Sequence, residues 1–170
     1  LGYQGLGEPL CWLAFGPLAY SAALIALNPL DIYLTSIPWR ESLLLGSGPS
    51  MATTLVLFCS HFHQIIEDKR HGKISPLVRL GAKRGANLIP WIIVTIYLFQ
   101  LFTIIYGFIP VFSLLFLISF PQAKRLINLL KSSYNKPQAI KNCKFIAIKF
   151  QTLNGIGLII GLIFNYLIYK

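Results

Sequence analysis

The chain has 170 residues, of which 55% are apolar and only 12% charged, and its mean hydropathy is +0.66. This composition excludes a soluble globular domain and predicts an integral membrane protein of all-α, polytopic architecture. A net charge of +10 could indicate nucleic-acid binding, but the positions of the basic residues favour membrane topology instead.

About five apolar runs are long enough for membrane helices, because roughly 20 apolar residues cross a bilayer core about 30 Å thick. In chain order they lie near 10–27, 43–66, 87–107, 110–130 and 145–168. They predict a single transmembrane domain over 1–170. Gly46, Gly48 and Pro49 predict a kink or a late start in the second run, and Pro110 separates the third run from the fourth.

The basic residues gather around two loops. Six of the fifteen Lys and Arg residues lie between Lys69 and Arg84, and seven lie between Lys124 and Lys149. With five spans, these two loops share one side of the membrane. The lysines of 131–144 are therefore interpreted as topology determinants, and no nucleic-acid partner is expected.

The opposite side is poor in positive charge. The segments 28–42 and 107–110 hold only Arg40 between them, whereas residues 1–9 share the side of the basic loops. The positive-inside rule places the basic side in the cytoplasm, or in the stroma if the membrane is a thylakoid.

The segment 59–81 is polar and charged, although apolar runs flank it. If the second span continues as a helix to about residue 69, two sets of polar side chains align on adjacent faces. These sets are Ser60, Gln64 and Asp68, and His63, Glu67 and His71. A carboxylate at the mouth of a transmembrane bundle costs free energy unless it is solvated or paired, which favours a functional role.

Three interpretations of this segment are open from spacing alone. Gln64 and Asp68 could supply oxygen ligands to Mg²⁺, with phosphates bound by the basic residues that follow. His63, Glu67 and His71 could instead bind Zn²⁺ or iron. The third interpretation is a wet interfacial helix end with no ligand.

Three segments form a distinctive set: 5–18 (GLGEPLCWLAFGPL), 60–68 (SHFHQIIED) and 72–81 (GKISPLVRLG). Together they resemble the UbiA-type intramembrane aromatic prenyltransferases, in particular the cyanobacterial and plastid branch that transfers phytyl groups to 1,4-dihydroxy-2-naphthoate. The order of the spans agrees with helices 5–9 of that nine-helix fold. Gly155, Gly157 and Gly161 in the last span suit close helix packing.

The resemblance implies a set of site residues. Asp68 and Gln64 take the two positions of the family's second acidic motif, which helps to hold Mg²⁺ on the prenyl diphosphate, and Gln64 is an amide where a carboxylate is usual. Lys73 and Arg79 are implied to contact the diphosphate.

Other polar residues of the matching segments have less defined roles. His61 and His63 could orient the aromatic acceptor or take its proton, or could be structural histidines. Glu8 could bind substrate or cap the helix that Pro9 begins.

The implied reaction transfers a phytyl group from its diphosphate to 1,4-dihydroxy-2-naphthoate with loss of CO₂, in phylloquinone or menaquinone biosynthesis. The family's first acidic motif is absent from these 170 residues, so the chain is expected to be the C-terminal half of such an enzyme and inactive without its N-terminal half.

Two alternatives to this function are open. One is a prenyltransferase for another acceptor, homogentisate or 4-hydroxybenzoate. The other is a non-catalytic membrane protein, such as a remnant or a channel subunit, and the few mid-membrane polar groups disfavour a channel.

Overall fold

The computed structural model describes residues 2–27 and 37–170, and within these ranges the chain is helical with no strand. The elements are η1 (Gly2–Gln4), α1 (Gly7–Leu13), the π-helical turn η2 (Ala14–Leu18), α2 (Ala19–Leu27), α3 (Trp39–Ser60), η3 (His61–His63), α4 (Ile65–Arg70), α5 (Pro76–Leu80), α6 (Ala82–Ile105), η4 (Val111–Ser119), α7 (Phe120–Ser133), α8 (Pro137–Ile140) and α9 (Cys143–Ile168). The all-α, polytopic prediction is confirmed.

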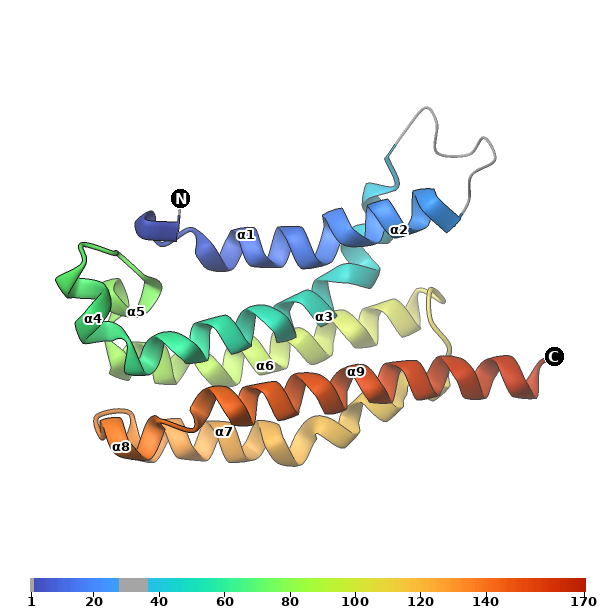
Figure 1. Ribbon diagram of the computed structural model, residues 1–170. Coiled ribbons are helices and arrows are strands. Elements are labelled where there is room, and N and C mark those ends of the chain that lie inside the picture. The colour runs from blue at the N-terminus through green and yellow to red at the C-terminus, as the bar shows by residue number, and fades with distance from the viewer. Residues whose placement is uncertain (1, 28–36) are drawn as a thin grey trace.

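The long helices run alongside one another as an elongated bundle (Figure 1). Central α3 packs against α1, η2, α6 and α9, and α7 packs against α6 and α9. Four of the described helical stretches are long and apolar enough to cross a membrane: Gly7–Leu27, Trp39–His63, Ala82–Ile105 and Pro137–Ile168. The second stretch begins at Trp39 and continues through Pro49 as helix, so the late start allowed by the sequence pattern does not occur.

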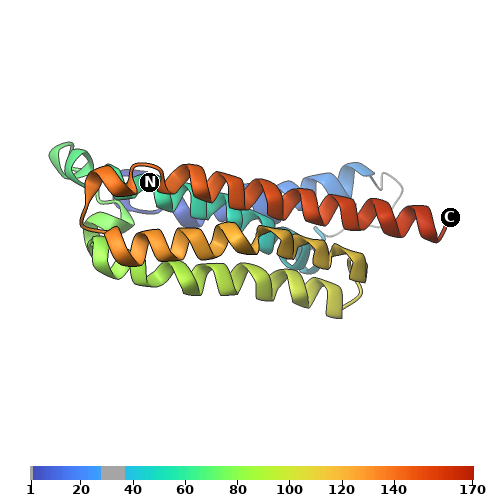
Figure 2. The same ribbon diagram turned by 90° about the horizontal axis from the view of Figure 1, so that it is seen from below.

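The expected span at 110–130 differs from the other four. It consists of the 3₁₀ helix η4 followed by the amphipathic α7, whose basic residues Lys124, Arg125 and Lys131 shorten its apolar part. A 3₁₀ helix rises about 2.0 Å per residue, compared with about 1.5 Å in an α-helix. The η4–α7 rod therefore extends along the bundle despite its short apolar stretch (Figure 2), and five membrane crossings remain a prediction.

Apolar side chains from α3, α6, α7 and α9 form one core, which includes Leu55, Phe58, Ile89, Ile96, Leu126 and Phe150. Polar side chains also pair between helices: Ser21 Oγ donates to Ser42 Oγ at 2.8 Å, and the amides of Gln100 and Asn154 bond to each other. The spans thus contain more polar groups than the sequence analysis expects, but these groups bond to one another.

Both basic loops lie at the same end of the bundle. Figures 1 and 2 show the N-terminal segment, α4, α5 and α8 together at this end, and the C-terminus at the other. This arrangement agrees with the expectation from the charge pattern that the two loops share a side. Of the expected loop 28–42, residues 28–36 lie outside the described residues, and Arg40 belongs to the first turn of α3.

Candidate functional site

A break in the second long helix positions the candidate site. α3 ends at Ser60, η3 tightens the chain over the next three residues, and Gln64 has non-helical dihedrals (φ −102°, ψ 0°) before α4 begins. Phe62 is buried and packs edge-to-face on Phe58, with ring centroids 5.9 Å apart. The second span therefore does not continue as one helix to residue 69, and the break turns Asp68 toward the bundle while Glu67 remains exposed.

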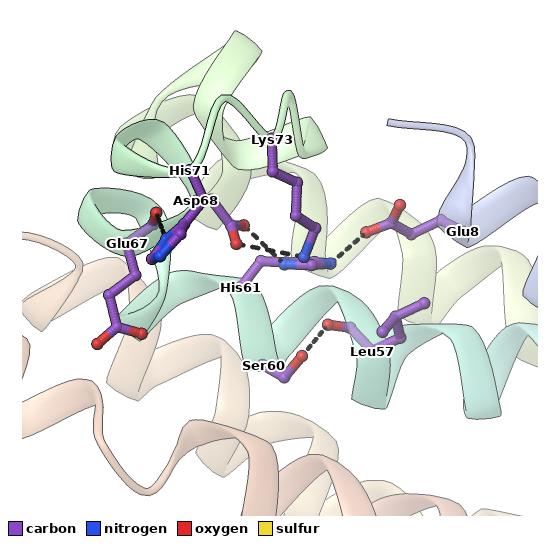
Figure 3. Close-up of polar contacts among 8 residues, drawn as sticks. All are labelled: Glu8, Leu57, Ser60, His61, Glu67, Asp68, His71 and Lys73. Carbon is purple, nitrogen blue, oxygen red and sulfur yellow. Dashed lines mark hydrogen bonds and ion pairs between the residues drawn. The ribbon is translucent and has the colours of Figure 1, made fainter. Parts of the chain in front are cut away.

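Asp68 lies in a compact group of charged side chains (Figure 3). One carboxylate oxygen lies 3.2 Å from Lys73 Nζ, and the other lies 3.2 Å from His61 Nδ1. The Asp68 side chain is only 9% exposed. A carboxylate in such a place requires partners, because burying an isolated charge costs several kcal/mol.

Glu8 reaches the same histidine from α1. Its Oε1 lies 3.3 Å from His61 Nε2, so the imidazole stands between two carboxylates (Figure 3). The contact with Asp68 is a hydrogen bond, whereas the contact with Glu8 is an ion-pair distance only. We call this group the charged cluster: Glu8, His61, Asp68 and Lys73.

Glu8 does not cap its helix. The N-cap of α1 is Leu6, and no side chain bonds to the free N–H groups of the first turn. Apart from the contact with His61, neither carboxylate oxygen of Glu8 has a hydrogen bond, although both are buried. The structure therefore leaves free acceptor capacity beside His61.

The pKa of Asp68 is lower than that of an ordinary aspartate. Burial is the largest single influence and acts in the opposite direction, but Ser75, Lys73 and His61 together outweigh it. Lys73 and His61 each lie 3.2 Å from a carboxylate oxygen of Asp68, whereas Ser75 Oγ is buried without a hydrogen-bond partner among the described residues.

This lowered pKa predicts an acid-dependent loss of stability. The stabilisation contributed by ionised Asp68 is complete above the unfolded-state pKa of about 3.9 and is lost as pH falls through the lower folded-state pKa. We expect the difference in free energy of unfolding between wild type and Asp68→Asn to be constant from pH 7 to about 5 and to shrink below about 4. Denaturant titration in detergent measures this difference, and a difference that grows on acidification would contradict the assignment.

The N-terminal segment closes over the loop that follows α4. Ile74 N–H donates to the Tyr3 carbonyl at 2.8 Å, and Arg79 Nη2 donates to the Gln4 carbonyl at 2.7 Å. Gly5 has φ +77°, and a Cβ there would collide with the Ile74 carbonyl oxygen, so only glycine fits this turn. These contacts explain how segments 5–18 and 72–81 come to lie together.

The predicted site residues divide into two groups. Glu8, His61, Asp68 and Lys73 come together in the charged cluster, whereas Arg79 instead holds the N-terminal segment. The Gln64 carbonyl accepts the Asp68 N–H at 2.8 Å, and the half-buried Gln64 side chain has no hydrogen bond to another of the described residues. His63 is exposed and outside the cluster.

The alternative of a zinc or iron site is not supported. In residues 2–27 and 37–170, no three His, Cys, Asp or Glu side chains converge in a way that could hold a metal. His71 Nδ1 instead lies 2.9 Å from the Glu67 carbonyl oxygen, and the Glu67 carboxylate points away from the histidine (Figure 3).

Cavities with mainly apolar linings lie along the described part of the bundle. A small one of about 130 Å³ adjoins Glu8 and is lined by Met51, Leu55, Phe58 and Ile92. A larger one of about 480 Å³ lies nearer the C-terminal end, between α2, α3, α6 and α9. The sequence gives no direct signal for either, because apolar residues face lipid and cavities alike.

The contact between Glu8 and His61 is the main feature that sequence reasoning missed. The two residues are on different helices, and nothing in their local spacing predicts that they meet. The available signal was a carboxylate at the start of an apolar helix, where it requires a partner.

The helices and the charged cluster define an all-α membrane protein with a buried, paired carboxylate at the basic end of its bundle. Comparison with curated proteins gives clear similarities. The chain is 36% identical over 164 residues to the 2-carboxy-1,4-naphthoquinone phytyltransferase of Synechocystis sp., and this covers 95% of the chain and 50% of that protein. It is 34% identical over 168 residues to the chloroplastic 2-carboxy-1,4-naphthoquinone phytyltransferase of Arabidopsis thaliana, covering 96% of the chain and 43% of that protein.

The chain thus spans about half the length of the curated relatives that it matches. The resemblance to cyanobacterial and plastid phytyltransferases, predicted from three short segments, is confirmed. No protein-family model matches the chain, and no solved structure matches it.

Proposed function

We propose that the chain forms one half of a prenyltransferase active site. The enzyme would transfer a phytyl group from phytyl diphosphate to 1,4-dihydroxy-2-naphthoate, with loss of CO₂, in phylloquinone or menaquinone biosynthesis. The observation that supports this most directly is Asp68, a buried carboxylate with a lowered pKa, paired with Lys73 at the basic end of the bundle. The similarity to named phytyltransferases points to the same chemistry.

The oxygen donors at this end fit Mg²⁺, a hard cation that binds through one or two carboxylates and substrate phosphates. Asp68 would hold it, and the Gln64 side chain, which has no hydrogen bond to another of the described residues, could add an amide oxygen. When bound, the ion neutralises charge on the departing diphosphate. These two side chains are too few for a complete site, so the remaining ligands would come from the first acidic motif of a missing N-terminal half.

Lys73 could pair with the diphosphate in place of Asp68. In the structure it neutralises Asp68, and its side chain is 27% exposed, so a diphosphate arriving at the bundle end could reach its ammonium group. Arg79 lies one helix further along and already donates to the Gln4 carbonyl. Arg79 would therefore reach a diphosphate only through its remaining N–H groups.

The transfer needs no general base at the reacting carbon. The new C–C bond forms at the carbon that bears the carboxylate, and the C–CO₂⁻ bond then breaks and returns its electron pair to the ring. Because CO₂ departs where a proton would otherwise leave, we assign His61 to hold Asp68 and Glu8 in place. His63 and the free oxygen atoms of Glu8 are candidates for contacts with the acceptor.

The redox state of the acceptor follows from the same chemistry. A prenyl cation requires an electron-rich ring, and 1,4-dihydroxy-2-naphthoate is the two-electron reduced form of 2-carboxy-1,4-naphthoquinone, the compound in the relatives' names. We therefore infer that the reduced form reacts. The apolar cavities beside Glu8 and between α2, α3, α6 and α9 offer water-poor space for the prenyl chain.

The charge distribution supports an orientation. The charged cluster and both basic loops would face the cytoplasm, or the stroma in a thylakoid membrane. On this side, diphosphate would leave the site into the aqueous phase and Mg²⁺ would enter from it. The lipid bilayer would surround the helices.

A chimera tests the proposal. This chain replaces the matching half of the Synechocystis phytyltransferase, and membranes that contain it receive Mg²⁺, phytyl diphosphate and acceptor kept reduced with dithionite. We expect a phytylated naphthoquinol together with equal amounts of CO₂ and diphosphate. The 170-residue chain alone should give no product.

Two further acceptors separate the alternatives. Faster transfer to homogentisate or 4-hydroxybenzoate would assign another acceptor. A chimera that inserts and folds but uses none of the three would favour a non-catalytic protein. Turnover by the chain alone would contradict the expected need for a second half.

A further inference from the structure

A basic groove lies between α7 and the start of α9, formed by residues outside the charged cluster. Its volume is about 570 Å³, and its lining includes Lys124, Arg125, Asn128, Leu129, Asn142 and Ile146. Two cations and one amide come from α7, the second amide is Asn142 at the start of α9, and Leu129 and Ile146 add apolar surface. A groove of this composition suits a ligand that is anionic at one end and apolar at the other.

The charge of the groove has no acidic partner. The sequence contains no Asp or Glu after Asp68, so 102 residues follow without a negative side chain. All three ion pairs in the described ranges use Glu8 or Asp68, and neither Lys124 nor Arg125 takes part in one. No acidic side chain of the described ranges therefore competes with an anionic ligand for this pair.

The groove lies where the bundle passes from apolar to polar surroundings. The exposed side chains of η4 are apolar, as at Leu115, Leu117 and Ile118, and Phe120 continues this surface. Lys124 follows one helical turn later, about 6 Å along the axis, and it and Arg125 are exposed. Such a change marks the level of lipid headgroups.

The N-terminal end of α9 adds a favourable potential. Asn142 is its N-cap residue, and the Asn142 side chain makes no capping hydrogen bond, so it is free to donate into the groove. The positive end of the dipole of this 26-residue helix lies at the same place and favours anions. The positive-inside rule would account for Lys124 and Arg125, but it requires neither the two amides nor a concave surface.

We propose that this groove binds the headgroup of an anionic membrane glycerolipid. Lys124 and Arg125 would pair with the negative headgroup, Asn128 and Asn142 would donate to its oxygen atoms, and Leu129 and Ile146 would contact the first acyl carbons. Basic pockets between membrane helices are suited to such headgroups. The proposal is independent of prenyl transfer, and its test measures lipid binding alone.

The first test is a native mass spectrometry titration of the purified chain with phosphatidylglycerol, in uncharged detergent. Lys124→Gln/Arg125→Gln should weaken binding about tenfold or more, since each basic residue near an anionic lipid contributes strongly. The matched control, Lys131→Gln/Lys136→Gln, removes the same charge outside the groove and should weaken binding less than about threefold, because exposed charges are screened. Equal losses in both double variants would overturn the proposal.

Two ligands separate the possible sources of the anion. Phosphatidylcholine should bind at least about tenfold more weakly than phosphatidylglycerol, because it has no net charge to pair with the groove. Inorganic phosphate at millimolar concentration should not displace the lipid. Displacement of the lipid by phosphate would indicate a site for free phosphate. Equal binding of the two lipids would indicate a site that does not select for charge. Either result would contradict the proposal.

A second measurement needs no variant. An amine-acetylating reagent is applied to the wild-type chain in nanodiscs of phosphatidylcholine, with or without phosphatidylglycerol. Phosphatidylglycerol should slow modification of Lys124 several-fold relative to Lys131 on the same helix. If the ratio of the two rates is the same in both membranes, the groove does not bind the anionic headgroup.

Discussion

Asp68→Asn is expected to lower prenyl transfer by the chimera at least about 100-fold, which corresponds to about 2.7 kcal/mol of lost transition-state stabilisation. The substitution preserves shape but removes the negative charge that would hold Mg²⁺ and that faces Lys73 at 3.2 Å. The quantity measured is kcat/KM for phytyl diphosphate at saturating Mg²⁺ and reduced acceptor.

The adjacent residue provides a matched control for Asp68. Glu67→Gln removes the same charge one position earlier, but Glu67 is exposed and its carboxylate points away from His61 (Figure 3). We expect this variant to keep activity within about twofold, as exposed charges contribute little. If the two variants lose activity equally, net charge at the bundle end matters and Asp68 has no special role.

Gly157→Ala is expected to lower the free energy of unfolding by about 1–3 kcal/mol, because it overpacks the contact between α9 and η4. A Cβ at Gly157 would collide with the Leu115 carbonyl group, and one at Gly161 would collide with the Ser113 backbone. These are backbone atoms, which cannot move aside as a flexible side chain can. Denaturant titration in detergent micelles, followed by circular dichroism, measures the loss.

The same helix contains its own control. Outside the backbone of α9 itself, no heavy atom lies within 4 Å of the position that a methyl group at Gly155 would occupy, so Gly155→Ala introduces no clash. This variant should be neutral, or more stable by up to about 1 kcal/mol, because alanine favours the helix over glycine. Equal destabilisation by both substitutions would indicate that helix propensity, rather than the η4 contact, governs this region.

The sequence was sufficient for the fold class and for most of the candidate site. Composition identified the membrane helices, and charge placement indicated which loops lie at the same end. The motif of 60–68 pointed to Asp68, which is the buried carboxylate that the structure pairs with Lys73. These features are local in the sequence, so periodicity and charge are enough to predict them.

The remaining features depend on contacts between distant segments. No proline or glycine lies in 60–64, so nothing in that segment predicts the helix break that brings Asp68 to His61 and Lys73. The three glycines of α9 look equivalent in sequence, yet only Gly157 and Gly161 touch η4. The 3₁₀ form of η4 also lacks a signal, because its apolar residues suit an α-helix equally well.

The buried pair of Gln100 and Asn154 bears on how the chain enters the membrane during synthesis. The two amides bond to each other, but 54 residues separate them, so α6 emerges from the ribosome long before α9. An unpaired amide in hydrocarbon is costly. Until α9 arrives, α6 must shelter Gln100 at the translocon or against α3, and a nascent chain halted between these helices should remain accessible to translocon crosslinkers.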